Sequence, residues 1–515
     1  MSRLESLLAP FQRELAALSA LCAERAAPAW LVGGTLRDAL AGRPIHDVDL
    51  VVGGPALELA RLAADQLGAS YVPLDEGHDV ARIALRSGDV IDLAGLRRPT
   101  LEADLLARDF TANAIAAPLL ADGRAGPLCD PLGGAADIAA RRLRLCAPEA
   151  LSDDPLRVLR AARLGAKLDW NLDPALDAAI RQSAPLLSRV AAERIRQELL
   201  ALLAQRWSAP WLRYLDAAGV LGLVLPELEP LRAEPERGAH AFSAWVHTLQ
   251  AVAAGEWILA ELRGDRRPGP AASPPAERDD SYPPAFFAKP AALATNRGLA
   301  ASLQWGGRVV EHFAAPLGKE HEREALWKLA LLMHDSAKPA TKAYDENGSL
   351  SYYDHHVVGA GLAAAAGERL RLSRAESAYV QAVVRGHMRP GQLGSQETTA
   401  RAAYRFFRDL GEAAVDTLLH ALADHLAARG PAVSAHGWAT HLAWTDAMLG
   451  FHWDARETER RRPLVDGTLL MAELGLKPGP RVGELLEALR EAQAAGEIAT
   501  GDEALALARR LQAQP

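Results

Sequence analysis

The sequence predicts an α+β protein, in which a small mixed-sheet unit comes first and a longer, mostly α-helical region follows. Short apolar runs typical of strands occur only up to about residue 140, at 29–32, 48–52 and 90–93. Further along, apolar residues recur at helical spacing in 156–168, 191–203, 324–333 and 375–384. With 515 residues, the chain exceeds the size at which a single core stops growing, so we expect several separate cores.

Composition and charge exclude several classes of protein. Apolar residues make up 49% and charged residues 24%, and no uninterrupted apolar stretch approaches the roughly 20 residues of a membrane span. Residues 1–28 space charges among leucines, as an amphipathic helix does and a secretory leader does not, so we expect a cytoplasmic protein without a membrane partner. The 3 cysteines lack C-x-x-C spacing and predict neither a disulfide framework nor a thiolate zinc site. The net charge of −8 (57 minus 65) means that RNA binding would require local basic patches.

The first candidate site combines a glycine turn with a pair of carboxylates. Gly33 and Gly34 follow the strand 29–32 and precede a helix, where backbone N–H groups can approach an anion. Asp47 and Asp49 then begin the next strand. Because residues i and i+2 of a strand share one face, roughly 6.6 Å apart, both carboxylates can converge on Mg²⁺ ions. Two such ions are the arrangement for in-line nucleotidyl transfer.

The order G-G-x-x-R-D, eight residues, D-x-D resembles the active-site motif of class II tRNA nucleotidyltransferases and bacterial poly(A) polymerases, within the polymerase-beta-like superfamily. The resemblance implies that Asp47 and Asp49 are catalytic and hold Mg²⁺, and that Gly33, Gly34 and Arg37 bind the nucleotide. Asp92 is either a third carboxylate of this site or a solvated strand position.

Two further motifs extend the resemblance. Residues 108–114 resemble R-D-F-T-x-N-A, which implies that Arg108, Asp109 and Asn113 contact the ribose and triphosphate. Alternatively, Asp109 caps a helix there. Residues 152–163 resemble the family's E-D-x-x-R motif, with Asp153 in place of the usual Glu, and the nucleotide site then also includes Asp154, Arg157, Arg160 and Arg163.

The E-D-x-x-R-like segment suggests how a base is chosen without a template. With Pro155 at the first helical position, Asp154 and Arg157 lie three apart and present an acceptor beside a donor fork. Cytosine and adenine both show an amine donor next to a ring acceptor, whereas uracil and guanine reverse that order. One Asp–Arg pair can therefore accept C and A. Alternatively, Asp154 only caps the helix.

The second candidate site consists of histidines and carboxylates. His334 and Asp335 end an apolar helix, and the pattern H…HD…H…H…D continues before and after them. Neutral imidazoles with carboxylates and without cysteine suit a divalent transition metal that generates hydroxide. The pattern resembles HD-domain metal-dependent phosphohydrolases, which implies six metal ligands: His247, His334, Asp335, His355, His387 and Asp424. His356 stands beside His355 and competes for the same role. Alternatively, this domain is a scaffold that has lost its activity.

These motifs divide the chain into four regions. We expect a nucleotidyltransferase head at 1–140, a helical neck with the base-selecting helix at 141–230, an HD domain at 231–440 and a helical tail at 441–515. Seven prolines between residues 264 and 290 indicate an insertion in the HD domain. The tail resembles that of CCA-adding enzymes, and its Lys477 and Arg481 could meet RNA phosphates.

The predicted function is template-independent addition of C and A, from CTP and ATP, to the tRNA 3′ end, with an appended HD phosphohydrolase. Two alternatives share this chemistry: a poly(A) polymerase that uses ATP only, and an A-adding or CC-adding specialist. A third, from another class, makes an HD phosphodiesterase or phosphatase the main activity. A non-catalytic RNA-binding protein is disfavoured by the intact carboxylate pair.

Overall fold

The computed structural model describes residues 3–235, 241–265, 302–317, 321–395, 397–459 and 463–513. These residues form two compact units. The first comprises residues 3–191 and 214–223, and the second comprises the other described residues. The predicted proline-rich insertion lies almost entirely outside the described residues. The expected boundary at 440/441 falls inside one continuous helix, α21 (Ala435–Glu459).

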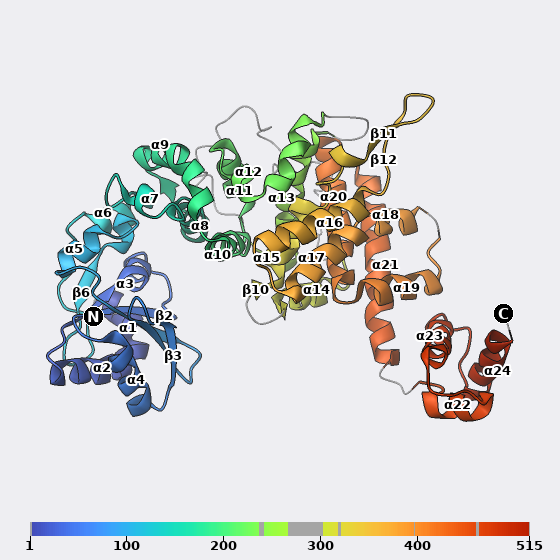
Figure 1. The fold of residues 1–515 in the computed structure, drawn as a ribbon, viewed down its shortest axis with the longest axis horizontal. Coiled ribbons are helices and arrows are strands. Elements are labelled where there is room, and N and C mark those ends of the chain that lie inside the picture. Colours follow the sequence, from blue (N-terminus) through green and yellow to red (C-terminus); the bar gives the residue numbers. More distant parts are fainter. Residues whose placement is uncertain are drawn as a thin grey trace. The chain divides into compact units, whose positions relative to one another are not determined.

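A six-stranded mixed sheet forms the centre of the first unit (Figure 1). Its strand order is β3-β4-β5-β2-β1-β6, and within it β2 and β5 run parallel. The three strands expected from the sequence are confirmed. The sequence pattern missed β3, an exposed strand that contains Pro73, β4, and β6, which has only 3 residues. The strand bounds are β1 (Ala29–Val32), β2 (Asp47–Val52), β3 (Ser70–Asp75), β4 (Val80–Ala84), β5 (Val90–Gly95) and β6 (Ala116–Pro118).

Helices that carry the first site lie next to this sheet. The amphipathic start of the chain forms α1 (Arg3–Leu8) and α2 (Gln12–Glu24), because Pro10 interrupts it with a 3₁₀ turn. Leu15 and Leu18 of α2 are fully buried. The other helices include α3 (Gly33–Leu40), α4 (Ala56–Leu67), α5 (Leu101–Leu106), α6 (Gly134–Ala139), α7 (Ala150–Asp153), α8 (Arg157–Leu168) and α9 (Pro174–Ser183).

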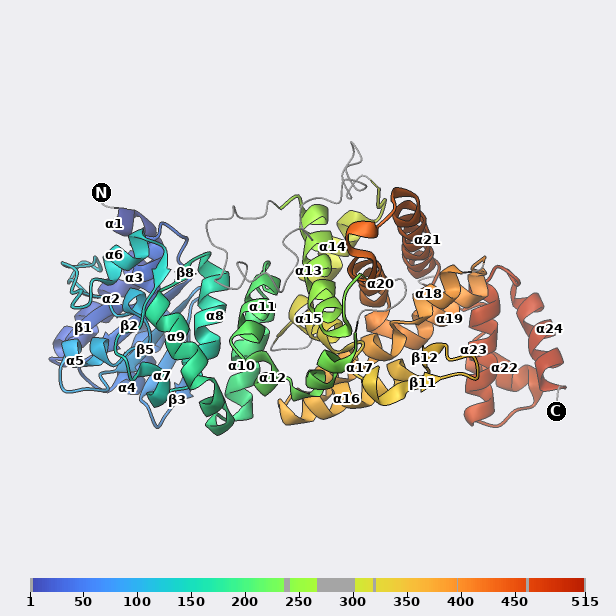
Figure 2. The ribbon, with the colours of Figure 1, turned by 90° about the horizontal axis from the view of Figure 1, so that it is seen from above.

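The second unit is mostly helical, as predicted, and Figure 2 shows α13 (Ala244–Arg263) beside α15 (Arg323–Met333). The helix α13 is apolar on all sides and almost completely buried, and it packs against both α15 and α20. None of the described helices combines the length and apolarity that a bilayer span requires. The helices that carry the second site, besides α13, are α15 (Arg323–Met333), α16 (His355–Arg369), α17 (Arg374–Gly386) and α20 (Ala414–Arg429).

The C-terminal part of the second unit has a core of its own. The helices α22 (Gly467–Leu474), α23 (Pro480–Ala494) and α24 (Gly501–Gln512) share buried side chains that include Leu470 and Leu485. This core begins at about residue 464, some twenty residues later than the expected tail.

Candidate active site and metal centre

The two predicted catalytic carboxylates lie on one face of β2. Asp47 is exposed, Val48 is fully buried and Asp49 is partly buried, which is the alternation of a strand with one covered face. Thr35, in the first turn of α3, fixes this strand: its Oγ1 accepts a hydrogen bond from the Asp49 N–H at 2.6 Å and donates to the Asp47 carbonyl at 3.4 Å. The helix α3 is therefore hydrogen-bonded directly to the main chain of the strand that carries both carboxylates.

The glycine turn touches the Asp49 carboxylate. Gly33 has a positive φ of 60°, in the region that favours glycine. A Cβ atom at position 34 would lie 2.9 Å from Asp49 Oδ2, closer than real Cβ atoms approach. A Cβ at position 33 would lie 3.1 Å from Nη1 of Arg108. Only glycines leave this room between the helix start, the carboxylate and the arginine.

Asp92 lies beside Asp49 on the neighbouring strand β5. In the parallel pairing of β2 with β5, Asp49 is opposite Asp92, so both side chains share one face. Arg82 holds Asp92 from the neighbouring strand, with Nε and Nη2 donating at 2.8 and 2.9 Å. Burial, and then the charge of Asp92, raise the pKa of Asp49 to about 6. Crowded carboxylate oxygens of this kind suit a hard divalent cation, so the residues fit the Mg²⁺ that the sequence predicts.

A chain of hydrogen bonds joins the other predicted nucleotide-binding residues. Arg37 is almost fully buried; it donates to both oxygens of Asp38 at 2.9 Å and to Asn113 Oδ1 at 2.8 Å. Asn113 Nδ2 in turn donates to Asp109 Oδ1 at 2.9 Å, and Arg160 reaches Asp109 Oδ2 at 3.5 Å. These bonds link α3, the segment 108–114 and α8 into one frame beside the carboxylates.

Asp109 therefore belongs to this frame. Its Oδ1 also accepts from the N–H of Phe110 at 2.7 Å. The N-cap of the 3₁₀ turn at Thr111–Asn113 is Phe110 and has no side-chain cap, so the alternative that Asp109 caps a helix here is wrong. Burial alone would raise the pKa of Asp109, but Arg160 and the bond from Asn113 hold it below its usual value.

Asp154 and Arg157 are placed differently from the expectation. The helix α8 begins at Arg157, so Pro155 is in the preceding turn, and Asp154 has an extended backbone at the end of α7. Asp154 Oδ1 accepts from the N–H of Leu156 at 3.3 Å, which is a local turn contact. Arg157 instead donates to three main-chain carbonyls, those of Ala107, Arg108 and Ala150. The two residues thus flank a turn, and the expectation that they share one helical face is wrong.

Three basic residues lie along one face of α8. Arg160, Arg163 and Lys167 follow one another at intervals of three and four, which places them on one helical face. Burial lowers the pKa of Lys167; Asp38 acts against this, and Arg37 and Arg163 lower it further. Such a cluster of cations is suited to the phosphates of a nucleotide.

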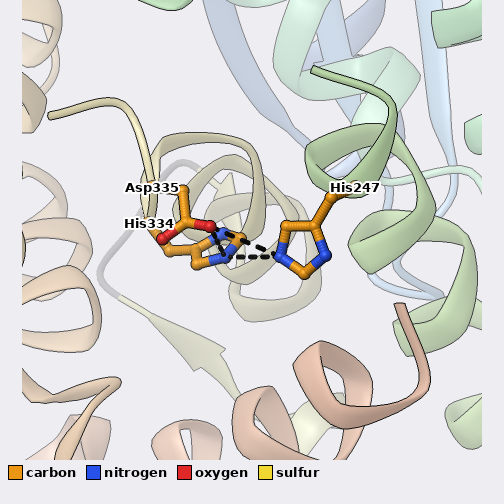
Figure 3. Close-up of side chains that lie close together, drawn as sticks. All are labelled: His247, His334 and Asp335. Atoms are coloured by element: carbon orange, nitrogen blue, oxygen red, sulfur yellow. Dashed lines mark hydrogen bonds and ion pairs between the residues drawn. The ribbon is translucent and has the colours of Figure 1, made fainter. Parts of the chain in front are cut away.

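The histidine and aspartate residues of the second site come together from five different helices or helix ends. His247 lies on α13, and His334 and Asp335 follow the end of α15 (Figure 3). Nε2 of His247 is 3.2 Å from Nε2 of His334, and these two atoms lie 3.4 and 3.2 Å from Asp335 Oδ2. Asp424, on α20, places Oδ1 3.0 Å from His247 Nε2. These residues form a first group of metal-ligand type.

A second group shares Asp335 with the first. Nε2 of His355 and Nε2 of His387 are 3.1 Å apart, and they lie 3.5 and 4.0 Å from Asp335 Oδ1. His356, the competing neighbour, only contacts the rings of His355 and His387 from the side. Two sets of three possible ligands therefore meet at one carboxylate: His247, His334 and Asp335, and Asp335, His355 and His387.

Three of these imidazoles are oriented by main-chain carbonyls. Nδ1 of His334 is 2.8 Å from the carbonyl of Leu331, and His355 and His387 make the same contact with the residue three positions earlier. With Nδ1 donating there, each Nε2 lone pair points at the other ligands, which is the arrangement found behind metal-bound histidines. The residues present therefore fit a divalent metal ion.

The charges of this site favour an ionised Asp335 and act differently on two of its imidazoles. Burial alone would lower the pKa of His334, but Asp335 raises it above its usual value. Burial alone would raise the pKa of Asp335, but His334 and Lys338 hold it well below the usual range. Burial, and then the charge of His334, lower the pKa of His387 to about 3. Lys338 itself forms an ion pair with Asp335 Oδ2 at 2.6 Å.

Sequence reasoning missed Lys338 and also His420, a buried residue of α20 beside His334 and His387. Lys338 lies three residues after Asp335, a spacing that could have pointed to an ion pair. His420 lies four residues before Asp424, a spacing that could have pointed to the same helical face.

Comparison with known families gives four matched segments. Residues 29–100 match the family described as Poly A polymerase head domain, and 169–231 match the probable RNA and SrmB-binding site of polymerase A. Residues 308–429 match the HD domain, and 432–508 match tRNA nucleotidyltransferase domain 2. His247 lies outside the matched HD segment, so it is the fold that brings it into the site.

Similarity to characterised relatives extends over nearly the whole chain. The A-adding tRNA nucleotidyltransferase of Deinococcus radiodurans is 35% identical over 488 residues, which cover 93% of this chain and 94% of the relative. The CC-adding tRNA nucleotidyltransferase of Thermus thermophilus is 32% identical over 93% of this chain and 92% of the relative. The chain belongs to the tRNA nucleotidyltransferase family. It is an enzyme of the nucleotidyltransferase class, with an HD domain, and the resemblance read from its motifs is confirmed.

Solved structures share the fold of this nucleotidyltransferase at low identity. A CCA-adding enzyme in complex with ATP is 20% identical, with a TM-score of 0.61 over 98% of both chains. The Thermotoga maritima CCA-adding enzyme in complex with tRNA has a TM-score of 0.56 over 97% of this chain and 94% of that one, also at 20% identity. The predicted fold class, a mixed-sheet head followed by a mostly helical remainder, is thereby confirmed.

Proposed function

We propose that the enzyme adds nucleotides, from CTP and ATP and without a template, to the 3′ end of tRNA. The observation that carries this proposal is the carboxylate group Asp47, Asp49 and Asp92 on one face of the sheet, with the glycine turn 33–34 against it. The names of the relatives, which specify A-adding and CC-adding activity on tRNA, support the same substrates.

The residues of the head have distinct parts in this reaction. Asp47 and Asp49 hold Mg²⁺, which when bound neutralises the triphosphate and lowers the pKa of the attacking 3′-hydroxyl. The glycine turn admits the phosphates close to the start of α3, and Arg108 and the cationic face of α8 offset their charge. The hydrogen bonds that join Arg37, Asn113, Asp109 and Arg160 keep these groups in place and so orient the nucleotide.

Base choice falls to Asp154 and Arg157. Asp154 is only partly buried and can offer a carboxylate to the exocyclic amine of C or A. The guanidinium group of Arg157 donates to the base when it gives up one or more of its hydrogen bonds to main-chain carbonyls. A base with the reversed pattern leaves both groups unpaired, which costs about 1–3 kcal/mol for each buried polar group.

Labelled nucleotide incorporation into three tRNAs tests the proposal. The substrates are tRNA lacking CCA, tRNA ending in C and tRNA ending in CC, each incubated with labelled CTP or ATP. We expect C to be added to the first two, A to be added to the third, and no extension beyond A. Open-ended extension with ATP would identify a poly(A) polymerase, and absence of incorporation on all three would overturn the proposal.

A specialist that adds only part of CCA is the second candidate. The relatives that match more than nine tenths of this chain at 30–35% identity are named A-adding or CC-adding. The relatives named multifunctional CCA protein match about 40% of it. In the same assay, an A-adding specialist extends only the tRNA that ends in CC, and a CC-adding specialist never adds A.

We further propose that the histidine cluster is a metal-dependent phosphohydrolase centre. Six residues supply it: His247, His334, Asp335, His355, His387 and Asp424. Asp335 turns one oxygen to each group of histidines, and these carboxylates and imidazoles would hold a divalent transition metal, which would supply a hydroxide nucleophile. Hydrolysis of a 2′,3′-cyclic nucleotide with and without EDTA tests this. Equal rates in both conditions would contradict it.

A further inference from the structure

His420 has a buried imidazole whose two ring nitrogens make no hydrogen bond to the described residues. It lies in the middle of α20, its exposed fraction is 0%, and among the described residues neither ring nitrogen has a hydrogen-bond partner. A buried polar group without a partner costs about 1–3 kcal/mol. Its neighbours along α20, Leu418, Leu419 and Leu422, are also fully buried, and a buried position of this kind is normally apolar.

The other buried polar side chains of α20 contrast with His420. Asp416, one turn earlier, accepts hydrogen bonds from His312, Arg323 and Tyr379. Thr417 donates to the carbonyl of Ala413 at 2.7 Å. The helix therefore satisfies its buried polar groups where the protein alone can do so, and His420 is the exception that needs another partner.

The position of His420 identifies what that partner is. Its ring centre lies 4.9 Å from that of His334 and 5.5 Å from that of His387, one ring from each group of ligands. Asp424, which approaches His247, lies one helical turn further along the same face of α20. A polar atom buried among metal-ligand residues of this type is explained by an ion or a water molecule that they hold in common.

We propose that His420 is a further residue of the metal centre, presenting a ring nitrogen to a divalent metal ion or to a water molecule that this ion carries. This inference rests on the proposed function of the histidine cluster and adds a seventh residue to it. Because His420 stands near both groups of ligands, its loss weakens metal binding as a whole without removing any of the six predicted ligands.

Binding of Co²⁺ to the full-length chain tests the proposal. All proteins carry Asp49→Asn, which removes a carboxylate from the head site, and are stripped of metal before calorimetric titration. We expect His420→Leu to bind Co²⁺ at least tenfold more weakly than its parent and to alter the visible absorption of bound Co²⁺. We also expect the metal-free thermal midpoint to stay equal or rise, because a buried unpaired polar group has been removed.

A control is His436→Leu, which removes an exposed imidazole at the start of α21. It should bind Co²⁺ like the parent. If His420→Leu fails to fold, His420→Met gives the same test with a more flexible side chain. Unchanged affinity and spectrum in a folded His420 variant overturn the inference. A parent that binds no Co²⁺ overturns the metal centre itself, a result that is distinguishable from the former.

Discussion

The carboxylate site of the head and the histidine cluster of the HD domain shift the pKa of an aspartate in opposite directions. In the head, burial and then the charge of Asp92 raise the pKa of Asp49 to about 6. In the HD domain, His334 and Lys338 outweigh burial and hold the pKa of Asp335 well below its usual range. Arg37 and Arg108 offset the rise at Asp49 only in part, whereas positive charge outweighs burial at Asp335.

The two sites also differ in access. In the head, Asp47 is exposed and Asp49 is partly exposed beside the glycine turn. In the HD domain, His247, His334 and Asp335 are each no more than 2% exposed. An open carboxylate site suits a reaction whose metal ions arrive with a nucleotide and a large RNA. A closed, pre-neutralised site suits metal ions that stay bound and a small phosphoester.

Removing Asp49 should have the largest effect and should affect only the head. Asp49→Asn keeps the size of the side chain and removes a metal-binding charge, so we expect nucleotide incorporation to fall at least 1,000-fold. Circular dichroism should stay unchanged, and metal binding by the HD domain should persist. Asp75→Asn, at an exposed position of β3, is the control and should retain normal incorporation. Near-normal transfer by Asp49→Asn would refute the assignment.

The converse variant, Asp335→Asn, should affect only the HD domain. Because Asp335 belongs to both groups of ligands, we expect the metal bound per chain, measured by mass spectrometry of the purified enzyme, to fall to background. Phosphodiester hydrolysis should fall at least 100-fold, whereas nucleotide incorporation should stay within twofold of the parent. Loss of incorporation in this variant would show that the two sites depend on each other.

A pH titration should separate the two sites more finely. Asp49 has a raised pKa of about 6, so below that pH it is mostly protonated and a metal ion must displace the proton. We therefore expect the affinity of the head for Mn²⁺, measured in the Asp335→Asn background, to be constant above pH 7 and to fall up to tenfold per unit below pH 6. Asp49→Asn should remove this dependence. A midpoint near pH 4 would contradict the raised pKa.

The smallest expected effect concerns base choice. Asp154→Ala removes the acceptor for the exocyclic amine, so we expect discrimination against UTP and GTP to fall about tenfold. The KM for the triphosphate should change less than twofold, because the phosphate-binding residues are untouched. Asp153→Ala is the neighbouring control. Unchanged selectivity in Asp154→Ala would leave that residue only its turn contact with Leu156.

The head could be predicted largely from the sequence because its site is local. Gly33, Gly34, Asp47 and Asp49 lie within 17 residues of one another, and a strand, a tight turn and a helix start bring them together. The alternation of β2 then places both carboxylates on one face. Asp92 remained ambiguous, because only the pairing of β2 with β5 decides that it stands opposite Asp49.

The HD domain needed the tertiary structure. Its ligands span residues 247–424, and no local rule says which of His355 and His356 faces Asp335. The direction of each ring follows from helix packing and from the carbonyls that hold three of the Nδ1 atoms. Likewise, the turn that separates Asp154 from Arg157 was not predictable from their spacing.

The sequence by itself determined the chemistry of this enzyme: which side chains can bind metal ions, which glycines leave room for phosphates, and that a mixed sheet is followed by helices. These follow from residue type and short-range periodicity. Only the tertiary structure decided which of those side chains face one another, that Asp335 lies against two pairs of histidines, and that buried His420 has no hydrogen-bond partner in the described part of the chain. The physical reason is that burial and pairing depend on contacts between residues far apart in the chain.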